Sequence, residues 1–133
     1  MNNGVGLVLD PGQIDRLAVE LNSRSYAEGF VGRFLENLPE RLARIQRSLL
    51  EGRSESALVA ILSVATSAAM AGAIQLEGRS RSIEMSIRAG DLAAARDAAG
   101  ALDTNAADFA RQVGALLSFS APPEPELELT RGV

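Results

Sequence analysis

The chain has 133 residues, enough for one domain of ordinary size, and a formal net charge of −4. All of its 13 basic residues are arginines, interleaved with acids rather than clustered, so we expect no nucleic-acid binding. Cysteine and histidine are both absent, which excludes disulfides, thiol and imidazole catalysis and Cys–His metal sites. Carboxylate chemistry, or a serine or threonine with an unusual activator, remains open. Because no spacing of the acids indicates a hydrolytic or metal site, we expect no enzyme activity, no metal and no cofactor.

The first half of the chain predicts two helices and the start of a third. Residues 9–21 open with an Asp-Pro-Gly turn and continue with apolar residues at helical spacing, which indicates a short leading helix. A longer helix is predicted over 25–51, with Pro39 inside it and Gly52 ending it. Its charged residues are typical of a solvated face, with Glu40 and Arg44 spaced as an i,i+4 pair. Ser54 is the predicted N-cap of the third helix, which begins near Glu55.

The second half predicts two more helices and a tail. The third helix should break between residues 72 and 78, after which the apolar phase resumes and ends at Gly90, with Asp91 as the next N-cap. A single last helix is predicted from Leu92 to Leu116, because its apolar residues alternate steps of three and four. Residues 119–133 are rich in proline and glutamate, and we expect a flexible tail there. The prediction is all-α: an up-down-up-down four-helix bundle over 1–118 with a short leading helix.

Residues 56–76, SALVAILSVATSAAMAGAIQL, form a run of 21 without a charge. The run is long enough to cross a bilayer. Most of it is small or weakly polar, and it has neither a flanking arginine cluster nor an aromatic belt. The N-terminus also lacks the features of a signal peptide. We expect no membrane-spanning segment, a cytoplasmic location, and a packed helix over this run.

Helical spacing predicts which residues of this run face the bundle. Five are expected to point inward: Ala57, Ile61, Val64, Ala68 and Ala71. A neighbouring stripe then consists of Leu58, Leu62, Ala65, Thr66 and Ala69. A contiguous apolar stripe on a soluble helix usually marks an interface. The alternatives are that the leading helix, the tail or a wider bundle covers it, and that the small residues serve only close helix packing.

The order of these elements resembles a known family, and so do two strings. FLENLPERLARIQRSLLEG (34–52) is similar to the second helix of the histidine-containing phosphotransfer (HPt) domain of two-component phosphorelays. GAIQLEGRSRSIEMSIRAGD (72–91) matches the family's pattern of Gly-Ala, Leu, an apolar-Glu pair and Arg-x-Gly-Asp. The resemblance covers roughly residues 9–117 and implies a four-helix bundle.

The family's functional motif is Ala-His-x-Leu-Lys-Gly-Ser-Ala followed by Gly-Ala, and without gaps it falls on residues 61–68 and 72–73. Four positions keep the motif residue: Ser67, Ala68, Gly72 and Ala73. Val64 is a conservative replacement. Leu62 stands at the phosphoacceptor histidine, Ala65 at the lysine and Thr66 at the glycine. An alkyl side chain has no lone pair for phosphoramidate formation, so the resemblance implies the scaffold without its chemistry.

The resemblance implies a pseudo-HPt protein, an adaptor or competitor whose partner is a response-regulator receiver domain or a histidine kinase region. In that family the stripe around Leu62 receives the receiver domain, so we expect its residues to be the partner-docking ones. A second hypothesis is a self-associating bundle in which the stripe is a homodimer seam. A third would use a hydroxyl of Ser63, Thr66 or Ser67 as phosphate carrier, and it is disfavoured because no base lies nearby in sequence.

Overall fold

Six helices account for the regular structure of residues 7–120, the part that this computed structural model describes; side chains are described over 7–117. They are α1 (Pro11–Glu20), α2 (Arg24–Leu50), α3 (Ser54–Ala71), α4 (Ile74–Arg88), α5 (Leu92–Ala99) and α6 (Leu102–Ser120). The described chain is all-α, and this confirms the predicted class. The tail was expected over 119–133; residues 121–133 lie outside the described residues, and α6 continues to Ser120, past the predicted boundary at 118.

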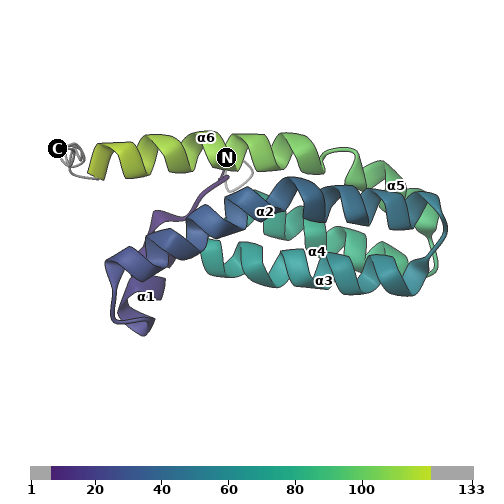
Figure 1. Cartoon of the computed structure of the whole chain (residues 1–133). Coiled ribbons are helices and arrows are strands. Elements are labelled where there is room, and N and C mark those ends of the chain that lie inside the picture. The colour runs from purple at the N-terminus through teal and green to yellow at the C-terminus, as the bar shows by residue number, and fades with distance from the viewer. Residues whose placement is uncertain (1–6, 121–133) are drawn as a thin grey trace, which may run out of the picture.

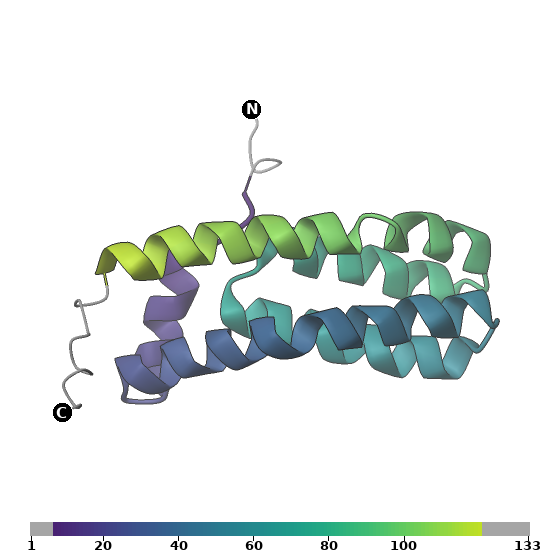
Figure 2. The same cartoon turned by 45° about the horizontal axis from the view of Figure 1, so that its top comes forward.

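Four helices lie lengthwise side by side, namely α2, α3, α4 and α6 (Figure 1). Helix α3 packs against α2 and α4, and α6 packs against the same two helices, so the four enclose one apolar core. Within that core Phe34 of α2 meets Phe109 of α6 edge to face, with ring centroids 5.9 Å apart. Helix α1 crosses the end of the bundle where α2 begins, and α5 lies at the opposite end (Figure 2). The arrangement is a helical bundle.

The helix boundaries largely follow the predicted signals. Pro39 lies inside α2, and the predicted N-cap Asp91 accepts a hydrogen bond from the Ala94 backbone N–H at 3.0 Å. Ser54 is not an N-cap: it is the first residue of α3, and Arg53 precedes it without a side-chain cap. The backbone N–H of Arg53 bonds back to the Ser48 carbonyl and closes the turn, so Ser54 already lies in the helix.

The prediction of a single last helix is wrong. The chain turns at Gly100 and Ala101, whose backbone N–H groups bond three residues back to Asp97 and Ala98, both at 3.2 Å. Gly100 keeps right-handed helical angles (φ −62, ψ −21), so the apolar phase is the same on both sides of the break. The predicted core positions are buried on both sides: Ala95, Ala99, Leu102, Phe109 and Val113.

Helix α1 is attached to the C-terminal end of α3. The backbone N–H of Asp10 donates to the Gly72 carbonyl at 2.8 Å, and the side-chain amide of Gln13 donates to the Met70 carbonyl at 3.4 Å. Gly72 has φ +78, and a Cβ there would lie 2.7 Å from the Asp10 carbonyl oxygen. The sharp turn from α3 into α4 and the seat of α1 therefore both depend on this glycine.

Helix α3 is, within the described residues, the one helix long and apolar enough to cross a membrane, with a mean hydropathy of 1.4. The core helix of a soluble protein meets the same criteria. Here the buried residues of α3 pack against α2 and α4, so its apolar content contributes to the bundle core. The absence of a membrane span and the cytoplasmic location stay predictions.

Candidate functional site

The inward face of α3 is the one that the sequence predicts. All five expected core residues are fully buried: Ala57, Ile61, Val64, Ala68 and Ala71. They recur at steps of three and four and therefore share one side of a helix that advances about 100° per residue. The apolar spacing thus predicts correctly which side of α3 faces the bundle core.

The predicted docking stripe divides between buried and accessible positions. Ala65 is 0% exposed, so its placement on an exposed stripe is wrong. Because α3 packs against two long helices, its buried arc is wide enough to take in Ala65 beside Val64. Leu58, Leu62 and Ala69 are half-buried, and Thr66 is exposed. Leu62, at the position equivalent to the phosphoacceptor, remains partly accessible, and docking at these residues stays a prediction.

The most exposed line of α3 lies slightly further around the helix, and the predicted stripe includes only Thr66 of it. Beyond Glu55, an exposed acid in the first turn of α3, this line consists of Val59, Ser63, Thr66 and Met70, which we call the outer face of α3. Val59 is 68% exposed and Met70 is 40% exposed. These four residues stand opposite the buried arc at the same three-and-four spacing, so a helical wheel centred on the core residues would have found them.

The alternatives of intramolecular cover are partly resolved. Helix α1 reaches only the C-terminal end of α3, through Met70 and Gly72, and the bundle itself covers Ala65. The tail lies outside the described residues. Within residues 7–117, Val59, Ser63 and Thr66 stay exposed, so the middle of the outer face is open there.

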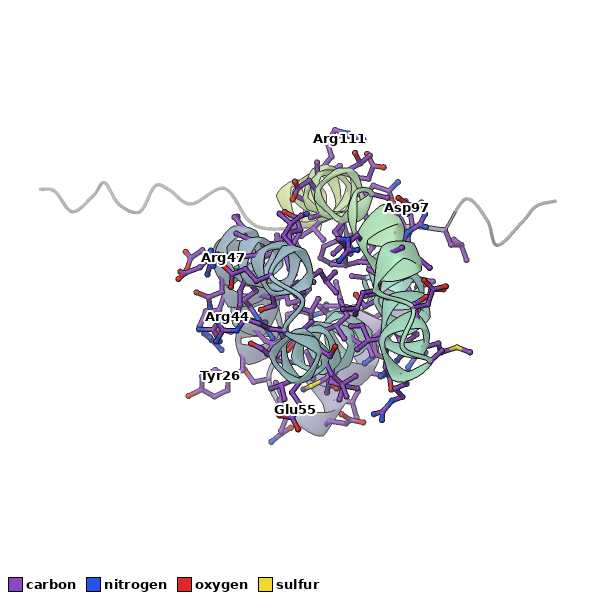
Figure 3. All side chains as sticks on the ribbon, turned by 90° about the vertical axis from the view of Figure 1, so that its right-hand side faces the viewer. Tyr26, Arg44, Arg47, Glu55, Asp97 and Arg111 are labelled. Carbon is purple, nitrogen blue, oxygen red and sulfur yellow. The ribbon has the colours of Figure 1, made fainter. Side chains whose placement is uncertain are left out.

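A groove of about 460 Å³ lies between α2 and α3. Its lining residues are Asn37, Glu40, Arg41, Arg44, Val59, Ala60 and Ser63, and we call it the α2–α3 groove. Val59 and Ser63 belong to both the groove and the outer face of α3. Figure 3 shows Arg44 extending outward from α2 on the same side of the bundle as Arg47. The groove is therefore polar and cationic along α2 and more apolar along α3.

Arg41 crosses the groove from α2 to α3. Its Nη2 donates to the Ser63 Oγ at 2.5 Å and to the Ser67 Oγ at 3.4 Å. Within residues 7–117, no carboxylate oxygen lies within 4.0 Å of a guanidinium nitrogen of Arg41 or Arg44, so the expected Glu40–Arg44 ion pair does not form. Desolvation by burial lowers the pKa of Arg41.

The site lacks the usual parts of a hydrolytic or metal centre in the described residues. No cluster of three or more acidic side chains that could hold a metal occurs there. Ser63 and Ser67 accept hydrogen bonds from a cation, and no hydrogen bond joins Ser63 to Glu40, the carboxylate that lines the same groove. A hydroxyl nucleophile needs a base within hydrogen-bond reach, and Glu40 does not serve Ser63 in that way in this arrangement.

The chain matches no protein-family model, no curated protein and no solved structure. The HPt resemblance therefore stays a prediction, and the site is interpreted from its own geometry.

Proposed function

We propose that this chain is a pseudo-HPt module: an up-down-up-down four-helix bundle with a leading helix that binds a receiver domain or a histidine kinase region of a phosphorelay without carrying phosphate. It would act as an adaptor, or as a competitor of a true phosphotransfer protein. The observation that carries the proposal is the uncharged outer face of α3, with Val59 exposed beside the half-buried Leu62. In the resembled family, a partner docks on this helix around the position that Leu62 occupies.

The chemistry of the outer face suits a protein partner. Interface centres are depleted in charged residues because burying an unpaired charge is costly, and no residue of the outer face is ionisable. Fully burying an exposed valine contributes roughly 1.5–3 kcal/mol before the costs of association. The small residues Ala60 and Ala69, which flank the outer face of α3, would allow a partner helix to approach closely.

The same residues support the absence of phosphate transfer. Leu62 offers no nitrogen, and the Ser63 and Ser67 hydroxyls accept hydrogen bonds from the cationic Arg41, which is not a base that could activate them. A partner bound here would meet a surface that competes for docking but neither accepts nor donates a phosphoryl group. We therefore propose that the chain inhibits its partner, or acts as a scaffold for it, by occupying the surface on which a true phosphotransfer protein would dock.

Calorimetric titration of the full chain with receiver domains and kinase phosphotransfer regions from the same organism would test the proposal. We expect Val59→Glu and Leu62→Glu each to weaken binding at least about tenfold, because each places a charge inside the contact. Met85→Glu on α4 is the matched control, since Met85 is 70% exposed and Val59 is 68% exposed. If no such domain binds, or if Met85→Glu weakens binding as much as Val59→Glu does, the proposal fails.

A homodimer is the second candidate, because Val59 and Met70 together expose apolar surface on one uncharged helix face. Sedimentation equilibrium at micromolar concentrations separates the two. A dimer that Val59→Glu dissociates would favour self-association, and a strict monomer would exclude it.

A further inference from the structure

The α2–α3 groove has an excess of positive charge. Arg41 and Arg44 line it together with a single acid, Glu40, which leaves one net positive charge. Seven ion pairs occur elsewhere among residues 7–117, and neither of these arginines takes part in one. Arg41 is also partly withdrawn from water, and that desolvation lowers its pKa. A partly desolvated cation without a counter-charge is stabilised by an anion that enters the groove.

The groove also presents hydrogen-bond donors in addition to charge. A guanidinium has five N–H donors, and Arg41 directs one nitrogen, Nη2, at the two serines. Because the Ser63 Oγ accepts from Arg41, its own hydroxyl proton remains free to be donated. Arg44 adds a second planar fork, and Asn37 adds an amide. Such forks match the two oxygens of a carboxylate in bidentate geometry.

We propose that the α2–α3 groove is a carboxylate-binding site in which Arg41 and Arg44 hold the two oxygens and Ser63 donates a third hydrogen bond. One net positive charge is neutralised by a monoanion. A phosphate monoester, which carries nearly two negative charges at neutral pH, would leave an excess of negative charge beside Glu40. Charge balance therefore favours a carboxylate over a phosphate monoester.

The position of the groove indicates where the carboxylate comes from. Val59 and Ser63 line the groove and also lie on the outer face of α3, so a protein docked on that face would extend over the groove. The source is then an aspartate or glutamate side chain of the docked partner, adjacent to an apolar contact on Val59. This assignment of the source rests on the proposed function, whereas the carboxylate site itself does not.

Acetate is the direct probe, because it needs no partner. The full chain, labelled with ¹⁵N, is titrated with sodium acetate at constant ionic strength, with sodium chloride replaced step by step, and the arginine Nε–H and backbone amide signals are followed. We expect saturable shifts confined to Arg41, Arg44 and Ser63. Linear shifts, or equal shifts at the exposed Arg79 on α4, would overturn the site. Tighter binding of inorganic phosphate than of acetate would overturn the carboxylate assignment.

Two substitutions with opposite expected effects sharpen the test. Arg44→Gln should weaken acetate binding at least about fivefold because one of two charged forks is lost, and Arg79→Gln should leave it unchanged. Glu40→Gln should strengthen acetate binding, because it removes the one acid that competes within the groove. If Glu40→Gln weakens binding, the charge argument is wrong.

The acetate titration and the partner titration test independent claims, so either proposal can fail while the other stands. Saturable acetate binding without any protein partner leaves the carboxylate site intact while the proposed function fails. A receiver domain that binds normally to Arg44→Gln, and less tightly to Val59→Glu, would support docking on the outer face of α3. It would also show that no acidic side chain of the partner occupies the groove.

Discussion

Helices α3 and α4 follow each other in the chain and pack together, yet their solvent-facing surfaces differ in kind. The outer face of α3 has no ionisable side chain. Helix α4 instead carries a ladder of ion pairs, in which Arg81 contacts Glu77 at 3.6 Å and Glu84 at 3.7 Å, and Arg88 contacts Glu84 at 3.0 Å. Both helices bury a stripe on the inside, which is apolar except for Ser80 of α4.

The difference indicates different uses of the two surfaces. Charged pairs at i,i+3 and i,i+4 suit a helix face that stays in water, because they support the helix and keep it solvated. A face without charges gains nothing comparable from water, but it can be covered by a partner without desolvating an ion. Helix α4 therefore has the surface of a solvated helix, and α3 has the surface of a contact helix.

The largest expected effect is on the turn that places these two helices side by side. Gly72→Ala should lower the free energy of unfolding by roughly 2–5 kcal/mol, because a left-handed backbone disfavours alanine and the new Cβ would lie 2.7 Å from the Asp10 carbonyl oxygen. Urea unfolding followed by circular dichroism measures the change.

Gly90, after α4, is the matched control for Gly72. Its φ is +79, close to the +78 of Gly72, but nothing lies within 4 Å of a Cβ there. Gly90→Ala should therefore cost only the conformational part, about 1–2 kcal/mol. If the two substitutions lower the free energy of unfolding equally, then the segment at Asp10 moves away from the new Cβ without cost, and α1 does not stabilise the turn at Gly72.

A smaller effect is expected on the charged ladder of α4. Glu84→Gln removes both ion pairs of Glu84 and should lower the free energy of unfolding by about 0.5–1 kcal/mol. The loss should shrink in about 1 M salt, where exposed charges are screened. Glu36→Gln on α2 is the control, since Glu36 is exposed and forms none of the ion pairs of residues 7–117. A loss at Glu84 that salt leaves unchanged would point to packing in place of charge.

Much of the fold could be predicted because helix ends and apolar phase are local properties. Positive φ at Gly52, Gly72 and Gly90 occurs where a stop was expected. The break at Gly100 could not be predicted from spacing, since the step of three from Ala99 to Leu102 is also a normal step within a helix. A break that preserves the phase leaves the apolar pattern unchanged.

The site was predicted less well, because it depends on how helices pack against each other. Spacing alone orients α3 correctly, but the width of its buried arc depends on its neighbours, and so Ala65 was placed outside. The contact of Arg41 with Ser63 joins residues 22 positions apart, and no periodicity within one helix encodes it. The charges around Arg41 suggested only a solvated face, whereas the structure places Arg41 over α3 with no carboxylate partner in the described residues.

The smallest expected effect on stability is that of replacing Arg41. This substitution tests whether Arg41 serves to bind an anion in the α2–α3 groove or to hold α2 and α3 together. Because desolvation lowers the pKa of Arg41, folding disfavours its charged form. The guanidinium stays protonated in both folded and unfolded chains near neutral pH, so this cost does not change with pH there. Arg41→Gln removes that cost together with the bonds to Ser63 and Ser67, and the two changes offset each other.

We therefore expect Arg41→Gln to change the free energy of unfolding by no more than about 0.5 kcal/mol, less than Glu84→Gln, and equally across neutral pH. The same substitution should abolish saturable acetate binding in the groove, as followed by the Ser63 amide signal. A destabilisation larger than that of Glu84→Gln would make Arg41 a structural link between α2 and α3. The α2–α3 groove would then no longer support the contrast between α3 as a contact helix and α4 as a solvated helix.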